Sequence, residues 1–293
     1  MKEILLISGK GGTGKTSISA ALGALAGNKA VVADCDVDAA NLHLLYEPEI
    51  TREENFYSGK EPVIDHNLCT KCGLCKEKCR FDAIYLEDGQ YKIDEVSCEG
   101  CSLCFHICPI DAIRMEKNLA GKWYCAKSRF GNDFLFAHLG IGKENSGKLV
   151  TKVKQEAKQL ADQRGISFIF VDGPPGIGCP VISSLSNVDV VLIVTEATQS
   201  GLHDLARLVE LIEYFNLKAF CVINKSDLNE EVTREIKEFC TDHNIQIITE
   251  IPFHPVFYET LQEGKTVIES QNSEIIDKIR KIFNEMTKEE NVK

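Results

Sequence analysis

The sequence predicts an α/β protein with a doubly wound, mostly parallel sheet and a small α+β insert. Three observations support this fold class. Short apolar runs alternate with amphipathic stretches, a glycine-rich loop follows the first apolar run, and eight of the 13 cysteines lie between residues 69 and 108. Alternation of strand and helix is typical of a parallel sheet that helices cover on both faces. The clustered cysteines interrupt that alternation and therefore indicate a separate insert.

The expected strands are short, continuous apolar runs, as buried parallel strands usually are. They span residues 4–7, 30–33, 168–171, 188–194, 219–223 and 246–251. The expected helices span residues 16–26, 148–163, 201–215 and 230–242, and in the second of these Val150, Val153, Ala157 and Leu160 share one face. The C-terminal isoleucines from Ile275 to Ile282 predict an amphipathic helix that docks on the core, with membrane binding as the alternative.

The strand and helix alternation stops near residue 48 and resumes near residue 148. We therefore expect residues 1–59 and 118–293 to form one nucleotide-binding domain in two parts. Residues 60–117 form the expected insert. Residues 119–147, which are rich in Gly, Asn and Ser, are expected to lead the chain back to the sheet.

Composition excludes several classes of function. The net charge of −11 argues against nonspecific nucleic-acid binding, which needs clustered Lys and Arg. The first residues have too short an apolar core for a signal peptide, so the cysteines are expected in a reducing cytoplasm rather than in disulfides. No stretch offers the roughly 20 apolar residues that span a bilayer, so no stable membrane insertion is expected.

The glycine-rich loop has the sequence Gly9-Lys10-Gly11-Gly12-Thr13-Gly14-Lys15-Thr16. A strand that runs into such a loop lets backbone N–H groups point at phosphate oxygens at the start of a helix. Lys15 is expected to neutralise the β- and γ-phosphates and the Thr16 hydroxyl to coordinate Mg²⁺. The expected nucleotide-binding residues of the loop are Gly11, Gly12, Thr13, Gly14, Lys15, Thr16 and Ser17. A glycine turn without ligand is the alternative.

The additional lysine, Lys10, distinguishes this loop from an ordinary phosphate-binding loop. Residues 10–16 resemble the Lys-Gly-Gly-x-Gly-Lys-Thr loop of the deviant phosphate-loop ATPases of the MinD, Mrp and nitrogenase iron-protein group, a P-loop NTPase class of SIMIBI type. In that group the first lysine reaches the partner's phosphates across a nucleotide-sandwich dimer. The resemblance implies ATP and Mg²⁺ as ligands, a catalytic role for Lys10 beside Lys15, and a homodimer, or a heterodimer with a related ATPase, on ATP binding.

Two further segments resemble the switches of that group. Asp34-Cys35-Asp36 is similar to the first switch, in which the residue at Asp36 orients or activates the attacking water. Asp172-Gly173-Pro174-Pro175-Gly176 is similar to the second switch. The resemblance implies that Asp172 holds Mg²⁺ through water and that the Gly176 N–H senses the γ-phosphate.

Two strand ends resemble the segments that bind the base. Asn224-Lys225-Ser226-Asp227 is similar to the base-reading segment, with Asn224 as the expected adenine contact. Ile251-Pro252-Phe253 resembles the loop that closes over the base, which implies a contact from Pro252. Without the resemblance, the first segment would be an ordinary turn.

Each of two cysteine runs has the spacing C-x2-C-x2-C-x3-C, by which bacterial-type ferredoxins hold [4Fe–4S] clusters. Four cysteines in so short a run are too crowded for zinc knuckles. In two-cluster ferredoxins the fourth Cys of each run binds the other cluster. The first expected cluster therefore takes Cys69, Cys72, Cys75 and Cys108. The second takes Cys79, Cys98, Cys101 and Cys104. Pro109 follows the second run as in ferredoxins, whereas Arg80 follows the first.

The other cysteines are expected to play lesser parts. Cys221 and Cys240 are expected to pack in the core. Cys179 follows the second switch, where the nitrogenase iron protein places a thiolate of a shared cluster, and Cys125 is the candidate second ligand. Packing or redox sensitivity is the favoured interpretation of Cys179.

The hypothesis from the sequence is a cytoplasmic ATPase switch. It would couple its nucleotide state to electron transfer, or to docking of a redox or Fe–S partner, through two [4Fe–4S] clusters. One alternative is an Fe–S carrier or scaffold of Mrp type. Another is a positioning or assembly ATPase in which the clusters are structural.

Overall fold

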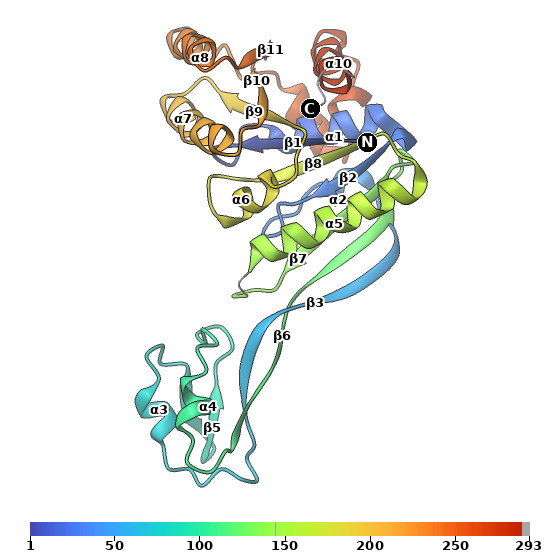
Figure 1. Ribbon diagram of the computed structural model, residues 1–293. Coiled ribbons are helices and arrows are strands. Elements are labelled where there is room, and N and C mark those ends of the chain that lie inside the picture. Colours follow the sequence, from blue (N-terminus) through green and yellow to red (C-terminus); the bar gives the residue numbers. More distant parts are fainter. Residues whose placement is uncertain (144, 289–293) are drawn as a thin grey trace. The chain divides into compact units, whose positions relative to one another are not determined.

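The computed structural model describes residues 1–143 and 145–288 and divides into two compact units (Figure 1). Unit 1 comprises Met1–Glu53, Trp123–His138 and Ser146–Lys293. Unit 2 comprises Glu54–Lys122 and Leu139–Asn145. The cysteine-rich runs lie in unit 2, and the glycine-rich loop lies in unit 1.

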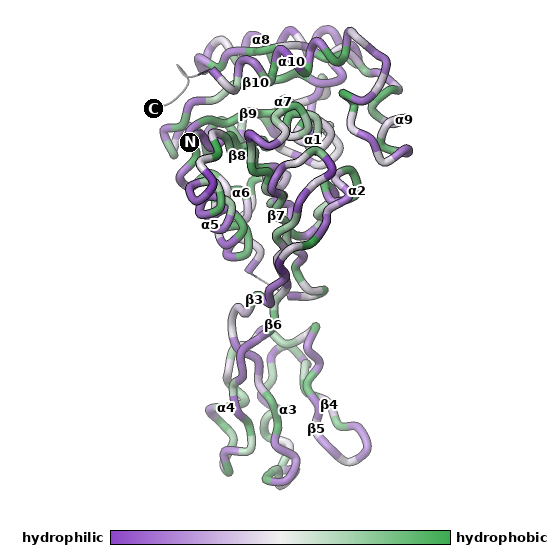
Figure 2. Tube along the Cα trace, turned by 90° about the vertical axis from the view of Figure 1, so that its right-hand side faces the viewer, coloured by the Kyte–Doolittle hydropathy of each residue, from purple (hydrophilic) through white to green (hydrophobic). Residues whose placement is uncertain are grey.

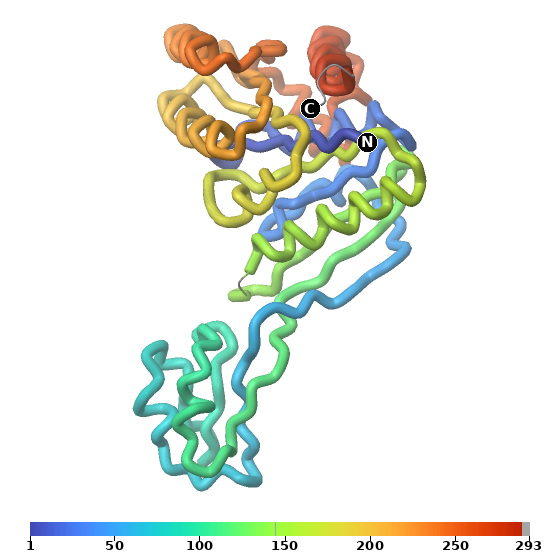
Figure 3. Tube along the Cα trace, in the orientation of Figure 1, coloured from blue at the N-terminus to red at the C-terminus, as the bar shows by residue number. Residues whose placement is uncertain are grey.

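Unit 1 is built on a sheet whose seven neighbouring strands are all parallel. Their order is β11 (Gln246–Ile251), β10 (Lys218–Asn224), β9 (Val190–Glu196), β1 (Lys2–Ser8), β8 (Phe168–Pro175), β2 (Ala30–Asp34) and β7 (Asp133–Leu139). Two long strands, β6 (Ile113–Lys127) and β3 (Glu49–Ile64), follow β7 in the strand order and continue along the chain into unit 2. The trace in Figure 3 shows β1, in dark blue, in the middle of the parallel strands.

Helices cover both faces of this sheet. One face carries α1 (Lys15–Ala26) and α10 (Ser273–Thr287), which contact each other and the short turn η2 (Val267–Glu269). The other carries α5 (Ser146–Arg164), α6 (Cys179–Leu185), α7 (Gln199–Tyr214) and α8 (Glu230–Asp242). The short elements η1 (Gly27–Lys29), α2 (His43–Tyr46) and α9 (Val256–Gln262) complete the unit. The doubly wound, mostly parallel sheet predicted from the sequence is confirmed.

The central strands are buried because both of their faces are covered. All seven residues of β1 and of β9 are buried, and Figure 2 shows the middle of the sheet as hydrophobic. The expected strands and helices agree with the observed elements to within a few residues at each end. The short helices α2, α6 and α9 and the strands β3, β6 and β7 were not expected from the sequence. Strand β7 lies in a segment rich in Gly, Asn and Ser. Phe134, Leu135 and Phe136 are nevertheless buried, and β7 pairs with β2.

The C-terminal helix α10 docks on the core, as expected. Ile275, Ile279 and Ile282 are at most 1% exposed and belong to the main apolar cluster. The Asn272 side chain caps the helix, accepting a hydrogen bond from the N–H of Ile275 at 3.0 Å. Across residues 1–143 and 145–288, no helix combines the length and apolar character needed to cross a membrane.

Unit 2 is a small α+β unit with an internal repeat. It contains the helices α3 (Leu74–Lys78) and α4 (Leu103–Ile107), which contact each other, and the antiparallel hairpin β4 (Ile84–Glu87) and β5 (Gln90–Ile93). The backbone takes left-handed conformations at equivalent positions within and shortly after the two cysteine runs. These pairs are Lys71 and Gly100, Gly73 and Ser102, and Asp82 and Asp111, with φ of 59° and 61°, 80° and 61°, and 50° and 52°. The two runs, which share one cysteine spacing, therefore also share a backbone conformation.

Candidate functional site

The polar residues expected in a nucleotide site follow the carboxyl ends of the parallel strands in unit 1. The glycine-rich loop follows β1, Asp34 ends β2, and Asp172 lies in β8. Glu196 ends β9, Asn224 ends β10, and Pro252 follows β11. The carboxyl ends of parallel strands share one edge of a sheet, which is where open α/β sheets bind ligands. The fold thus brings the expected site residues to one edge.

The glycine-rich loop requires glycine at Gly14. This residue has φ of 90°, in the left-handed region, and a Cβ there would come within 2.3 Å of the Asn224 Nδ2. The Asn224 amide donates to the Thr13 carbonyl oxygen at 2.7 Å. Asn224 therefore holds the loop in shape, and its expected contact with adenine stays a prediction. Thr16 and Ser17 lie in the first turn of α1, directly after the loop.

Lys15 and Asp172 form a buried ion pair beneath the loop. Lys15 is 5% exposed and Asp172 is 1% exposed, and the Lys15 Nζ lies 2.7 Å from the Asp172 Oδ1. The Ser19 hydroxyl donates to the same oxygen at 2.6 Å. Ser19 was not expected in the site, because nothing in its surroundings along the chain marks it. The second oxygen, Asp172 Oδ2, is buried and has no hydrogen-bond partner. The Thr13 Oγ1 is likewise buried and has no partner.

These residues fit a bound Mg²⁺. A buried carboxylate oxygen without a partner is costly unless a ligand satisfies it. Mg²⁺ prefers oxygen ligands and usually takes only one or two from the protein. Asp172 and the hydroxyl of Thr16 are the residues that would hold it, as the sequence predicts.

Asp34 organises the segment that carries Asp36. Its side chain is fully buried and accepts hydrogen bonds, each 3.1 Å long, from the backbone N–H groups of Asp36, Asn41 and Leu42. Burial and the nearby charge of Asp172 raise the pKa of Asp34 to about 8. Asp36 is half-buried, and burial raises its pKa too. Asp34 thus positions the backbone, and Asp36 remains the expected catalytic carboxylate.

Glu196 joins two lysines beside the loop. Its carboxylate lies 2.6 Å from the Lys10 Nζ and 2.8 Å from the Lys225 Nζ. Lys10 also donates to the hydroxyls of Thr198 and Ser200, at 3.1 and 2.6 Å. Burial opposes ionisation of Glu196, but the hydrogen bonds from the two lysines hold its pKa below the usual value. Glu196 was not expected in the site, although an acidic residue at the carboxyl end of a buried strand was an available signal.

The two segments expected at the base lie together. The Ser226 N–H donates to the Ile251 carbonyl at 3.0 Å, and the Phe253 N–H donates to the Asp227 carboxylate at 2.6 Å. Pro252 lies between these two links. In contrast, the Gly176 N–H donates to the Ser8 carbonyl at 2.9 Å rather than facing open space. A phosphate contact from Gly176 therefore requires this bond to open.

The eight clustered cysteines line two separate hollows in unit 2. Cys69, Cys72, Cys75 and Cys108 line one hollow. Cys79, Cys98, Cys101 and Cys104 line the other. Each hollow thus takes its fourth cysteine from the opposite run. The remaining lining is mostly apolar, and the Ala112 N–H donates to the Cys108 Sγ at 3.3 Å.

The cysteines surround these hollows rather than meeting at a point. In residues 1–143 and 145–288, no three or more His, Cys, Asp or Glu side chains converge as they would around a single metal ion. Burial raises the pKa of the Cys104 thiol to about 11. Of the other cysteines, Cys221 and Cys240 are fully buried, so their expected role in packing is confirmed. Cys179 is exposed at the start of α6, and Cys125 is half-buried on β6.

Comparison with known proteins agrees with this geometry. Residues 4–267 match the family described as the CobQ/CobB/MinD/ParA nucleotide binding domain. An uncharacterized protein of Methanocaldococcus jannaschii is 35% identical over 287 residues, which cover 97% of this chain and 96% of that protein. A second uncharacterized protein of the same organism is 30% identical over 248 residues, covering 78% of this chain and 83% of its own.

Solved structures of low sequence identity share the fold. The cell division ATPase MinD of Pyrococcus furiosus gives a TM-score of 0.57 at 20% identity, covering 97% of this chain and 98% of its own. The septum site-determining protein MinD of Pyrococcus horikoshii, solved with Mg-ADP, gives 0.58 at 20% identity, covering 98% and 96%.

Proposed function

Because the chain belongs to the CobQ/CobB/MinD/ParA nucleotide-binding family, we propose that it is an ATPase switch that carries two [4Fe–4S] clusters. It binds ATP with Mg²⁺, dimerises around the nucleotide and hydrolyses it. The nucleotide state controls electron transfer, or docking of a redox partner, through the clusters. Residues 1–59 and 118–293 form the nucleotide-binding domain, and residues 60–117 form a ferredoxin-like insert.

The partnerless Asp172 Oδ2 supports the nucleotide part of the proposal. This oxygen is buried beside the loop that would receive the phosphates, and it lacks the hydrogen bond that a buried carboxylate needs. Mg²⁺, when bound there, supplies positive charge to the phosphate oxygens. Lys15, which now neutralises Asp172, would then be available to the phosphates.

Asp36 and Lys10 take the two remaining catalytic roles. A half-buried carboxylate next to the site can accept a hydrogen bond from water and orient it for attack. The Lys10 side chain is 29% exposed, and its ammonium forms an ion pair with Glu196. Once that ion pair opens, the ammonium can reach a partner's phosphates. Loss of Lys10 should therefore impair the dimer, whereas loss of Asp36 should impair hydrolysis.

The two cysteine-lined hollows support the cluster part of the proposal. Four cysteines at separate corners suit a [4Fe–4S] cluster, in which each thiolate binds a different iron, better than they suit one metal ion. The lining of each hollow matches one set of four cysteines predicted from the spacing. Bound clusters supply one-electron chemistry. The apolar lining would lower the polarity around them, and the Ala112 N–H would stabilise thiolate charge on Cys108.

Iron analysis tests the clusters directly. The full chain, purified anaerobically or reconstituted with iron and sulfide, should contain about eight iron atoms per chain. Cys179→Ser should leave this number unchanged, because Cys179 lies outside both hollows. A colourless protein that carries zinc would contradict the proposal, and iron lost with Cys179 would indicate a third site.

Coupling is tested by measuring ATP hydrolysis with the clusters oxidised and then reduced. A coupled switch should hydrolyse ATP at different rates in the two redox states, because a change at the clusters would then alter the nucleotide site. The iron-free chain is the control, since the same reductant should leave its rate unchanged. Equal rates in both redox states of the loaded protein would contradict coupling.

A second candidate function is a positioning or assembly ATPase with structural clusters. The shared fold of the MinD structures favours it, as does that of McdA from Cyanothece, with a TM-score of 0.57 at 16% identity. Recruitment to a membrane or filament that depends on ATP, together with equal rates in the two redox states, would select it. A carrier of Mrp type would instead transfer iron and sulfide to an apo-acceptor, which fully ligated clusters disfavour.

A further inference from the structure

A cavity of about 420 Å³ lies entirely within unit 2, beside both cysteine-lined hollows. It shares Pro62, Ile93 and Cys98 with the hollow of the second cysteine set. It shares Ile64 and Tyr91 with the hollow of the first. Its volume falls within the range of about 300–1,000 Å³ that is usual for small-molecule sites. A molecule in this cavity would therefore be separated from each hollow by a single layer of side chains.

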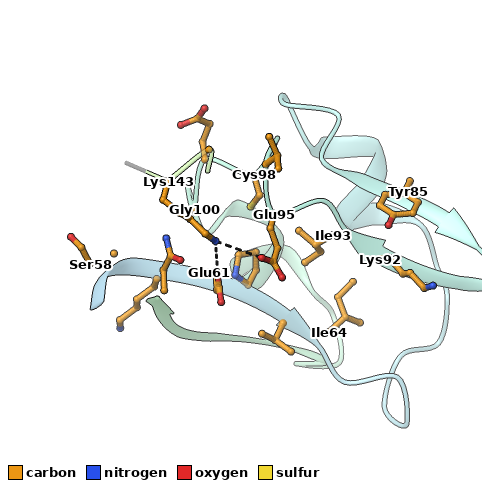
Figure 4. A pocket seen from close by; sticks show the side chains of 18 of the residues that line it. Ser58, Glu61, Ile64, Tyr85, Lys92, Ile93, Glu95, Cys98, Gly100 and Lys143 are labelled. Atoms are coloured by element: carbon orange, nitrogen blue, oxygen red, sulfur yellow. Dashed lines mark hydrogen bonds and ion pairs between the residues drawn. The ribbon is translucent and has the colours of Figure 1, made fainter. Parts of the chain in front are cut away.

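The cavity has mixed walls of the kind that bind flat, polar rings. Pro62, Ile64 and Ile93 provide apolar wall, and the rings of Tyr85 and Tyr91 lie on the hairpin side. Figure 4 shows the Lys143 ammonium between the carboxylates of Glu61 and Glu95. The distances from the Lys143 Nζ are 3.3 Å to Glu61 and 3.6 Å to Glu95.

One polar atom of the lining lacks a partner. The Asn118 Oδ1 is buried and accepts no hydrogen bond. An amide oxygen accepts two hydrogen bonds and donates none, so it fits an N–H donor. Lys60, Lys92 and Glu99 line the cavity as well, so the formal charges of its lysines and glutamates balance. The buried amide oxygen and this balance of charge favour a neutral ligand with an N–H donor.

We propose that this cavity binds a flat heteroaromatic redox ring with an N–H edge, of the isoalloxazine class found in flavins. The ring would lie against the apolar wall, and its N–H would donate to the Asn118 Oδ1. The choice of a redox ring over another flat heterocycle rests on the proposed function, because a ring beside both hollows is useful only if the hollows hold electron carriers. The cavity and its unpaired amide oxygen do not depend on that function.

Riboflavin is the probe, because it carries the ring without a phosphate. We expect the anaerobically purified full chain to quench riboflavin fluorescence saturably, with one site per chain. Asn118→Leu should weaken binding about tenfold, the usual effect of losing one hydrogen bond to a buried acceptor. The matched control is Asn55→Leu, an exposed position on β3 outside the cavity, which should bind as the unmodified chain does.

A second variant tests the cavity in case Asn118→Leu does not fold. Lys143→Met removes the ammonium between Glu61 and Glu95 and should change the affinity while thermal unfolding stays cooperative. No saturable binding, or binding that neither Asn118→Leu nor Lys143→Met alters, would overturn the inference. Iron content separates it from the proposed function. A chain with about eight irons that ignores riboflavin overturns only the ring site, whereas an iron-free chain that binds riboflavin overturns only the clusters.

Discussion

At the scale of single residues, the nucleotide site contains two buried carboxyl groups, of which one is paired with a buried lysine. Asp34 and Asp172 are both buried, and Lys15 is the buried cation that pairs with Asp172. Asp34 has three backbone hydrogen bonds but no ion pair of its own among the described residues. This arrangement makes stability depend on pH.

We predict that the unfolding free energy of the chain without nucleotide and Mg²⁺ falls as pH rises from about 4 to about 8. The pKa of Asp34 is about 8 in the folded state and about 3.9 in an unfolded chain. Between these values the folded state binds more protons, so stability decreases with rising pH. Urea unfolding across this range should show a flatter slope for Asp34→Asn than for the exposed control Asp162→Asn. Equal slopes would contradict the assignment.

The crossed lining of the two hollows gives a second prediction at this scale. Cys72→Ala with Cys108→Ala removes two cysteines of one hollow, so about four irons should remain. Cys72→Ala with Cys79→Ala removes one cysteine from each hollow, so nearly all iron should be lost. Iron analysis and electron paramagnetic resonance of the reduced proteins distinguish the two cases. The reverse pattern would mean that each run holds its own cluster.

At the scale of elements, helix α10 covers part of the core near the helix that follows the glycine-rich loop. It contacts both α1 and β11. Its buried isoleucines lie on one face, and the Lys2 ammonium donates to the Met286 carbonyl at 2.5 Å near its end. The helix therefore contributes to the stability of unit 1.

We predict that Ile279→Ala lowers the unfolding free energy by about 2–5 kcal/mol, the usual effect of a buried Ile to Ala change. Ile279 is fully buried, whereas Ile276 on the same helix is only partly buried. Ile276→Ala should therefore have a clearly smaller effect. Denaturant titration measures both, and equal losses would show that α10 is not docked through this face.

Sequence patterns predicted the elements that carry their signal locally. The apolar runs predicted strands β1, β2, β8, β9, β10 and β11, and the glycine-rich loop was evident from its spacing. Strand β7 was missed because its apolar residues lie in a segment rich in Gly, Asn and Ser. Glu196 offered a local signal, its place at the end of a buried strand, but its partner Lys10 is far away in the sequence. Ser19 offered none, and its partner Asp172 is equally distant. Contacts between distant segments cannot be read from local composition.

At the scale of the whole molecule, the proposed switch depends on two copies of the chain. We predict that Asp36→Ala with ATP and Mg²⁺ accumulates as a dimer, because it binds nucleotide but hydrolyses it slowly. Adding Lys10→Ala should return it to a monomer, since the lysine that reaches the partner is lost. Light scattering after size exclusion measures the mass. A monomeric Asp36→Ala protein that still binds ATP would contradict nucleotide-driven dimerisation.

The repeated backbone of unit 2 limits what half of it could do alone. Both halves turn in the same way at matching positions, yet each hollow takes one of its four cysteines from the other half. One half in isolation would therefore offer three cysteines to its hollow and leave its fourth without a partner set. Two copies of one half, paired symmetrically, would supply four cysteines to each hollow. Such a pair is the smallest assembly that could hold the proposed clusters completely, although the halves of this chain differ at positions such as Arg80 and Pro109.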